Sequence, residues 1–181
     1  MSYDREELLQ KLTFSLAMNP SISMTELAKK NEISRASLNR IFSSKDNLQE
    51  VILQKVQEVC TEISKILNKN HANFMDDLKN VIANFYDNRN YILFICRDVF
   101  SDCLDEKILQ QQEFELTNFF IEGQKQNLIT KTIPAEIITN IFLGNVTWLL
   151  CMQAEANNIA ADDLQKIILE TFLNGIGEKN R

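Results

Sequence analysis

Residues that interrupt helices are scarce in this 181-residue sequence, which contains only 4 Gly and 2 Pro. This shortage disfavours a fold of many tight turns and favours long helices joined by short loops. No run of about 18 apolar residues is present, so we expect no membrane span. The charged start, MSYDREELLQ, lacks the apolar region of a signal peptide, and the expected compartment is therefore the cytoplasm.

Residues that bind metals or carry acid–base chemistry are also few. His71 is the only histidine, and Cys60, Cys96, Cys103 and Cys151 form no CxxC pair. The sequence has no Gly-rich phosphate loop and no nucleophile elbow. We therefore predict no metal, no other cofactor and no enzyme activity, and we interpret the cysteines as buried small hydrophobic residues. Cys96 and Cys103 lie two helical turns apart, which leaves a redox-sensing role open.

The charge is unevenly distributed along the chain. The net charge is −6, yet residues 1–50 hold seven basic and seven acidic residues, so the remainder carries the whole excess. A nucleic-acid partner is thus compatible only with the N-terminal segment, and binding there should be sensitive to salt.

Apolar residues recur with helical periodicity through most of the chain, and no strand-like alternation is present. We therefore predict an all-α protein of about nine helices. Their expected ranges are about 5–18, 23–30, 34–42, 45–67, 74–86, 91–102, 105–126, 134–157 and 162–173.

Residues 23–48, SMTELAKKNEISRASLNRIFSSKDNL, have the features of a helix-turn-helix. A capping box at Ser23-Met24-Thr25-Glu26 opens the first short helix, and Ser34 caps the second. Small and apolar residues are spaced to face inward and to fill the turn: Leu27, Ala28, Ile33, Leu38, Ile41 and Phe42. The pattern predicts two short helices that cross closely at a tight turn.

The outward face of the second short helix has the chemistry needed to contact DNA. Arg40 could read a guanine, Asn39 an adenine, and Ala36 a thymine methyl group. The other polar residues are better placed for phosphates, which position the protein without reading sequence. The full set of candidate DNA-binding residues is Thr25, Ser34, Arg35, Ala36, Ser37, Asn39, Arg40 and Lys45. The alternative is an ordinary solvated helix face.

The stretch LAKKNEISRASLNRIFSSKDNL resembles the DNA-binding domain of the TetR family of bacterial regulators. The likeness rests on the Ile33-Ser34-Arg35 start of the second helix, on the Phe42-Ser43-Ser44-Lys45 exit, and on Asp46 and Leu48 after it. Two positions depart from the family pattern. Glu32 stands where the turn usually has Gly, so that either Glu32 is strained in a left-handed conformation or Asn31 adopts it. Asn39 replaces a tyrosine that contacts phosphate.

The resemblance implies a DNA-binding domain at 1–45 and a helical ligand-binding and dimerisation domain at 46–181. Aromatic residues concentrated in the second part are candidates for lining an effector pocket, although such residues also simply fill cores. The candidates are Phe85, Tyr91, Phe94, Phe119, Phe120 and Trp148. A small hydrophobic or amphipathic molecule would suit such a pocket.

Residues 137–152, IITNIFLGNVTWLLCM, are apolar around most of a helix, which must then be covered on more than one side. With the amphipathic final helix they are expected to form a homodimer interface, as the resemblance also implies. The candidates there are Gly144, Leu164, Ile167, Ile168 and Phe172. A monomer whose own helices cover the apolar surface is the alternative.

These features predict a transcriptional regulator that binds a palindromic operator in double-stranded DNA as a homodimer. We expect a repressor that is released when a small molecule binds and shifts the long fourth helix. Two other functions remain open. The first is a helical adaptor that uses the same N-terminal helices to bind a protein, and the second is a DNA-binding protein without a small-molecule inducer.

Overall fold

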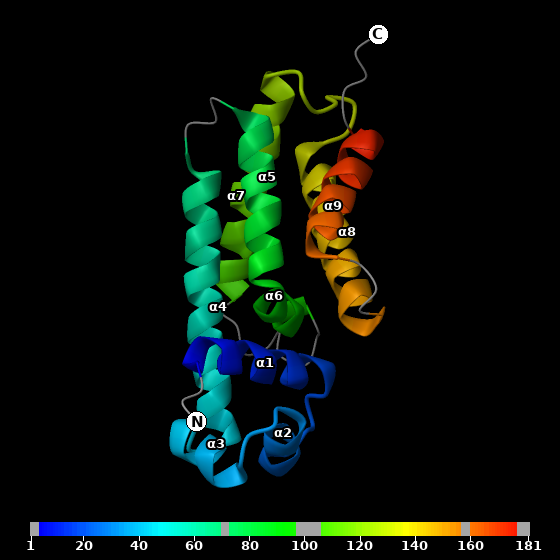
Figure 1. Cartoon of the computed structure of the whole chain (residues 1–181). Coiled ribbons are helices and arrows are strands. Elements are labelled where there is room, and N and C mark those ends of the chain that lie inside the picture. The colour runs from blue at the N-terminus through cyan, green and yellow to red at the C-terminus, as the bar shows by residue number, and fades with distance from the viewer. Residues whose placement is uncertain (1–3, 70–72, 97–105, 157–159, 177–181) are drawn as a thin grey trace. The chain divides into compact units, whose positions relative to one another are not determined.

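The computed structural model describes residues 4–69, 73–96, 106–156 and 160–176. Within these ranges the chain forms nine α-helices and no strand (Figure 1). Their bounds are α1 Arg5–Met18, α2 Met24–Lys30, α3 Arg35–Ile41, α4 Lys45–Leu67, α5 Phe74–Asp87, α6 Arg89–Cys96, α7 Glu106–Lys125, α8 Ala135–Ala156 and α9 Ala161–Ile176. The prediction of an all-α protein with about nine helices is confirmed, whereas His71, Cys103 and the end of the predicted helix 91–102 lie outside the described residues.

The helices divide into two compact units. The first unit contains residues 1–59 and 89–105, and the second contains residues 60–88 and 106–181. Helix α4 therefore belongs to both, and α6 belongs to the first unit although α5 and α7 belong to the second. The boundaries of these structural units differ from that between the predicted domains 1–45 and 46–181. The boundary between those functional domains stays a prediction.

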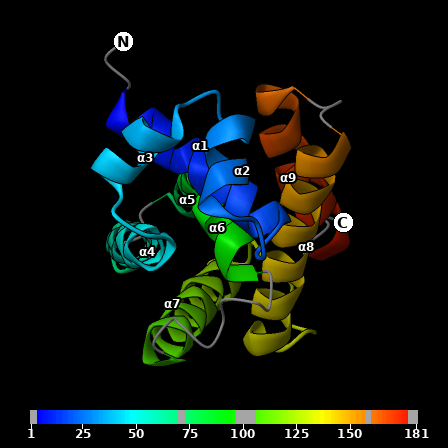
Figure 2. The same cartoon turned by 90° about the horizontal axis from the view of Figure 1, so that it is seen from below.

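In the first unit, α1 packs against α2 and α6, and α2 packs against α3 (Figure 2). The apolar face predicted for α1 is buried, with Leu12 and Leu16 fully enclosed. Asp4 begins α1 by accepting hydrogen bonds from the backbone N–H groups of Glu6 and Glu7. Such a cap satisfies N–H groups that have no partner inside the helix.

Phenylalanine rings dominate the core of the second unit, where α8 packs against α7 and α9 and where α5 packs against α8 and α9. Phe120 lies 5.4 Å, centroid to centroid, from Phe142 and from Phe172. Phe74 stacks on Phe119 at 4.5 Å. Gly123 permits this packing, since a Cβ there would lie 2.6 Å from the Phe74 ring.

Residues 135–154 of α8 are long and apolar enough to cross a membrane by length and composition alone. Only 33% of the most apolar stretch is buried inside the molecule, so much of this helix remains uncovered. Its inward side contributes Ile138, Phe142, Val146 and Leu150 to the core of the second unit. The expectation that α8 needs cover on more than one side thus agrees with its surface.

The cysteines differ in exposure. Cys60 is buried and Cys151 is half-buried, but Cys96 is exposed. The prediction that all four are buried is therefore wrong for Cys96, which is the last residue of α6.

Candidate nucleic-acid interface

Two serines begin the helices of the helix-turn-helix, as the sequence predicts. Ser23 Oγ accepts from the backbone N–H of Glu26 at 3.2 Å, and the Glu26 carboxylate accepts from the backbone N–H of Ser23 at 2.9 Å. Hydrogen bonds from the Ser23 hydroxyl and backbone lower the pKa of Glu26. Ser34 Oγ accepts from the backbone N–H of Ser37 at 3.0 Å. The start of α3 is therefore fixed by its own side-chain cap.

The turn between α2 and α3 contains a strained residue. Glu32 has a φ of 54°, whereas Asn31 has a φ of −101°. Of the two alternatives, Glu32 thus adopts the left-handed conformation. The backbone N–H of Ile33 donates to the Ala28 carbonyl at 3.0 Å, and that of Glu32 donates to the Lys29 carbonyl at 3.3 Å. This pair of bonds is a Schellman motif, which normally has Gly at the position of Glu32.

The helix crossing is buried as predicted. Leu27, Leu38 and Phe42 are fully enclosed, and Ile33 fills the turn. Ile41 is only half-buried, because it is the last residue of α3 and lies at the edge of the crossing. The inward residues therefore hold α3 rigidly against α2 and leave its other side open.

Most of the predicted DNA-contacting residues belong to α3 or its cap, whereas Thr25 lies on α2 and Lys45 begins α4. Thr25, Ser34, Arg35, Ala36, Asn39 and Arg40 are exposed, and Ser37 is half-buried. Among the described residues neither Arg35 nor Arg40 has an ion-pair partner. Two uncompensated guanidinium groups on one short helix form a surface suited to phosphates and guanine edges.

Other cations near α3 are already engaged within the first unit. Lys45 Nζ donates to the Pro20 carbonyl at 2.6 Å and is half-buried, so it ties the start of α4 to the loop after α1. Lys30 Nζ lies 5.9 Å from the centroid of the Phe14 ring. Lys45 is therefore placed to position the helix-turn-helix, and its predicted phosphate contact would have to coexist with this hydrogen bond.

No protein-family model matches the chain. The chain is 27% identical over 186 residues to the HTH-type transcriptional regulator NfxB of Pseudomonas aeruginosa, with 100% of this chain and 98% of the relative covered. It superposes on the ketosteroid transcriptional regulator KstR2 of Mycobacterium tuberculosis at 15% identity and a TM-score of 0.72, covering 99% of this chain and 97% of that one. It also superposes on the TetR-family regulator PfmR of Thermus thermophilus at 14% identity and a TM-score of 0.62, covering 95% of both.

The chain has the TetR-family fold. The resemblance seen in the N-terminal motif is thereby confirmed over nearly the whole chain. The relative from Pseudomonas aeruginosa is described as a transcriptional regulator, which agrees with the predicted regulatory role.

Within this TetR-family fold the six aromatic pocket candidates occupy three kinds of position. Phe85, Phe119 and Phe120 lie in the ring cluster of the second unit. Tyr91 and Phe94 are buried on α6, which belongs to the first unit. Trp148 lies on the outer side of α8 with 67% of its surface exposed.

A cleft of about 360 Å³ borders one of these candidates, Phe119. Its lining is both apolar and polar: Leu67, Asn68, Lys69, Asn118, Phe119, Ile121, Glu122 and Lys125. This volume lies within the range of small-molecule sites, and the mixed lining would suit an amphipathic molecule better than a purely apolar one.

The five predicted interface residues differ in burial. Leu164, Ile168 and Phe172 are buried in the second unit's own core, so they support α9 from within. Ile167 is half-buried and Gly144 is exposed, and a Cβ at Gly144 would meet no atom within 4 Å. Only these two of the five face outward.

Sequence reasoning assigned residues 137–152 to the interface but, apart from Gly144, did not single out the residues on the outer face of α8. Ile137, Ile141, Trp148 and Met152 are all exposed, and together with Gly144 they are spaced three or four residues apart. We call these five residues the α8 stripe. The spacing was a usable signal, because residues at such intervals share one side of a helix.

A buried carboxylate on α7 was also missed. Glu115 is only 6% exposed and accepts hydrogen bonds from Ser64 Oγ on α4 and, at 2.7 Å, from Gln111 Nε2. Burial raises its pKa, but hydrogen bonds from Ser64, Gln111 and Asn68 outweigh that effect and leave the pKa lowered. Within the second unit this charged group fixes the register of α4 against α7.

Proposed function

We propose that this protein is a sequence-specific DNA-binding transcriptional regulator. The observation that carries the proposal is the α3 surface, where Arg35, Asn39 and Arg40 are exposed on a helix that is capped by Ser34 and supported by the buried Leu38. The N-terminal part of such a helix enters the major groove in helix-turn-helix proteins. Because phosphates supply much of the affinity, binding should weaken as salt is raised.

The acting species is a homodimer whose copies meet at the α8 stripe. Apolar side chains aligned on one exposed helix face favour association with a second copy, and Gly144 allows another helix to approach closely. Two recognition helices related by a two-fold axis would reach successive major grooves about 34 Å apart. The operator is therefore a palindrome.

In this proposal a small amphipathic or hydrophobic effector binds the second unit and releases a repressor from its operator in the cytoplasm. The cleft beside Phe119 supports an amphipathic molecule. The effector acts only if it binds the DNA-competent and DNA-incompetent states with different affinity. Continuous α4 gives the second unit a covalent connection to the first.

The test is selection of bound sequences from random duplex DNA at low salt. A palindrome with half-sites about one helical turn apart is the expected result. Arg40→Ala should weaken binding of that duplex by about 5- to 150-fold, equivalent to about 1–3 kcal/mol for a good base contact. Lys11→Ala, on an exposed side chain of α1 paired with Glu7, is the matched control and should bind as wild type does.

If folded, dimeric protein selects no motif even after refolding free of ligand, DNA recognition is excluded and the adaptor role is favoured. Dimerisation is tested separately by sedimentation equilibrium. Trp148→Glu should raise the dissociation constant at least about 30-fold, since a central aromatic is a typical binding hot spot worth about 2 kcal/mol or more. An unchanged constant would place the dimer interface elsewhere.

A further inference from the structure

Helix α6 is the place where the chain returns to the first unit. Its neighbours along the sequence, α5 and α7, belong to the second unit, and Asn88 alone separates α5 from α6. The side chain of Asn88 donates to the Asn84 carbonyl at 3.0 Å, so this junction is held by the end of α5. The chain therefore passes from α5 to α6 through a single residue.

The buried side of α6 is anchored on α1. Tyr91, Ile92, Leu93 and Phe94 are all buried, and α1 and α6 pack closely together. The Tyr91 hydroxyl donates to Glu6 Oε1 at 3.0 Å, across 85 positions of sequence. Burial of the ring and the neighbouring Glu6 carboxylate raise the pKa of Tyr91, so the hydroxyl remains a donor at neutral pH.

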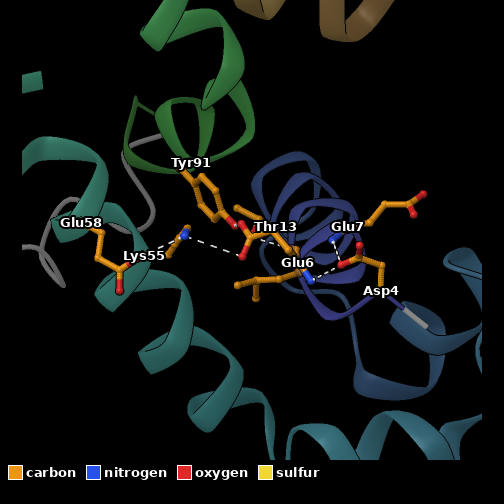
Figure 3. Close-up of polar contacts among 8 residues, drawn as sticks. Asp4, Glu6, Glu7, Thr13, Lys55, Glu58 and Tyr91 are labelled. Atoms are coloured by element: carbon orange, nitrogen blue, oxygen red, sulfur yellow. Dashed lines mark hydrogen bonds and ion pairs between the residues drawn. The ribbon is translucent and has the colours of Figure 1, made fainter. Parts of the chain in front are cut away.

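The same carboxylate also attracts α4. Lys55 Nζ lies 3.7 Å from Glu6 Oε2 and 3.2 Å from Glu58 Oε2. Figure 3 shows Glu6 between Tyr91 and Lys55, so that one side chain of α1 connects to α6 on one side and to α4 on the other. We call Glu6, Tyr91 and Lys55 the three-helix latch.

The two contacts of the latch differ in strength. The Tyr91 contact is a charge-assisted hydrogen bond from a buried ring, whereas the Lys55 ion pair is long and partly exposed to solvent. Elsewhere on α1, Ser15 Oγ accepts from Asn31 Nδ2 at the end of α2 at 3.2 Å, whereas Lys11 and Glu7, 2.6 Å apart, are both on α1. The hydrogen bond from Tyr91 to Glu6 thus adds a specific polar contact to the apolar packing of α6 on α1.

We propose that the Glu6–Tyr91 hydrogen bond couples α6 to α1 and thereby to the helix-turn-helix, so that operator binding and the packing of α6 depend on each other. The inference rests on the proposed function and names how its regulation is transmitted. Tyr91 is a positioning residue in this scheme, and it acts through α1 and not by contact with DNA or effector. Linkage requires that if α6 influences operator affinity, the operator stabilises α6 by the same factor.

Reciprocity makes the proposal testable without knowing the effector. The probe is the operator duplex obtained by selection, added to saturation, and the readout is amide hydrogen exchange of full-length dimeric protein. In the wild type, exchange in α6 should slow about fivefold or more, a typical size for coupling between sites. In Tyr91→Phe, which keeps the buried ring, the operator should slow α6 exchange by less than about twofold.

Three variants separate coupling from a merely structural role. Glu6→Gln keeps an acceptor for Tyr91 and loses the charge that faces Lys55, so α6 should still be protected by DNA. Glu6→Ala removes the acceptor and should lose that protection. Glu7→Gln, which breaks the exposed pair with Lys11, should behave as the wild type does.

The inference is overturned if the operator protects α6 equally in the wild type and Tyr91→Phe, or if the wild type shows no protection of α6 although duplex is bound. Failure to select any duplex is a different result, which removes the proposed function itself. In that case exchange of the unbound protein still reports on the latch. Tyr91→Phe should then speed exchange in α6 and at the start of α1 together, and faster exchange in α6 alone would show that the hydrogen bond does not join the two helices.

Discussion

The two units of this protein are stabilised by different kinds of interaction. In the first unit, short helices begin at side-chain caps such as Ser23 and Ser34, and they cross over leucines. In the second unit, longer helices pack around phenylalanine rings drawn from α5, α7, α8 and α9. The first arrangement is encoded within a few residues of sequence, whereas the second requires contacts between distant segments. The position of α3 is therefore determined by residues close to it in sequence, whereas the packing of the second unit is determined by many residues from distant segments.

The largest effect should come from removing the centre of the ring cluster. Phe120→Ala deletes a fully buried ring in contact with Phe119, Phe142 and Phe172. The free energy of unfolding, measured by urea titration of the dimer at fixed concentration, should fall by about 3–5 kcal/mol.

Phe114→Ala is the matched control for that variant, because Phe114 lies on the same helix with 62% of its surface exposed. It should change the free energy of unfolding by less than about 0.5 kcal/mol. Equal losses in the two variants would mean that the ring cluster is not what stabilises the second unit.

The two units should also differ in cysteine reactivity. Burial raises the pKa of the Cys60 thiol to about 11, whereas Cys96 is exposed on α6. At pH 8, raising the pKa of the Cys60 thiol from its ordinary 9.0 to about 11 lowers its thiolate fraction about 100-fold. Iodoacetamide labelling followed by peptide mass mapping should therefore find Cys96 modified well before Cys60, and denaturant should abolish the difference.

The raised pKa of Cys60 also sets the sign of a stability change. The native state holds this proton more tightly than the unfolded state, whose ordinary value is 9.0. The contribution is thus complete below about pH 9 and is lost as the pH rises towards 11. Unfolding free energy of Cys60→Ala should consequently decline less over this range than that of the wild type, and parallel declines would contradict the assignment.

The contrast between the units explains what the sequence could predict. Caps, periodic leucines and the turn at Glu32 are visible in neighbouring residues, so α1 to α4 were predicted with bounds close to those found. Tyr91 is among the aromatic pocket candidates because aromatic side chains commonly line such pockets. Its hydrogen bond to Glu6 joins residues 85 positions apart in the sequence, and no local sequence pattern predicts it.

A similar limit applied to the outer surface of the second unit. The apolar composition of α8 indicated that two sides need cover, but not which residues face the core. The structure buries Phe142 and exposes Trp148, which lie six residues apart. On α9 the choice of Leu164, Ile168 and Phe172 as interface residues followed the amphipathic face, and that face packs within the chain. Distinguishing an inner from an outer apolar face requires the partner helices.

A smaller effect is expected from the cap of the recognition helix. Ser34→Ala removes the acceptor for the Ser37 N–H and should lower the free energy of unfolding by about 1 kcal/mol. Ser34→Gly, which leaves the N–H groups open to water, should lower the free energy of unfolding by only a few tenths of a kcal/mol. Thermal or urea unfolding distinguishes the two, and equal costs would show that the hydroxyl is not what fixes the start of α3.

The smallest expected effect concerns the turn itself, and its sign is opposite. Glu32→Gly relieves a left-handed residue, a gain of about 1–2 kcal/mol, but it loosens the unfolded chain at a cost of about 0.5–1 kcal/mol. The net change should be a stabilisation of about 0–1.5 kcal/mol, measured by urea unfolding. Asn31→Gly is the neighbouring control, since Asn31 has a negative φ and its side chain donates to the Leu27 carbonyl at 2.9 Å. It should destabilise. Because the two substitutions add the same glycine one residue apart, opposite signs would trace the strain to Glu32, and equal signs would mean that the turn relaxes without strain.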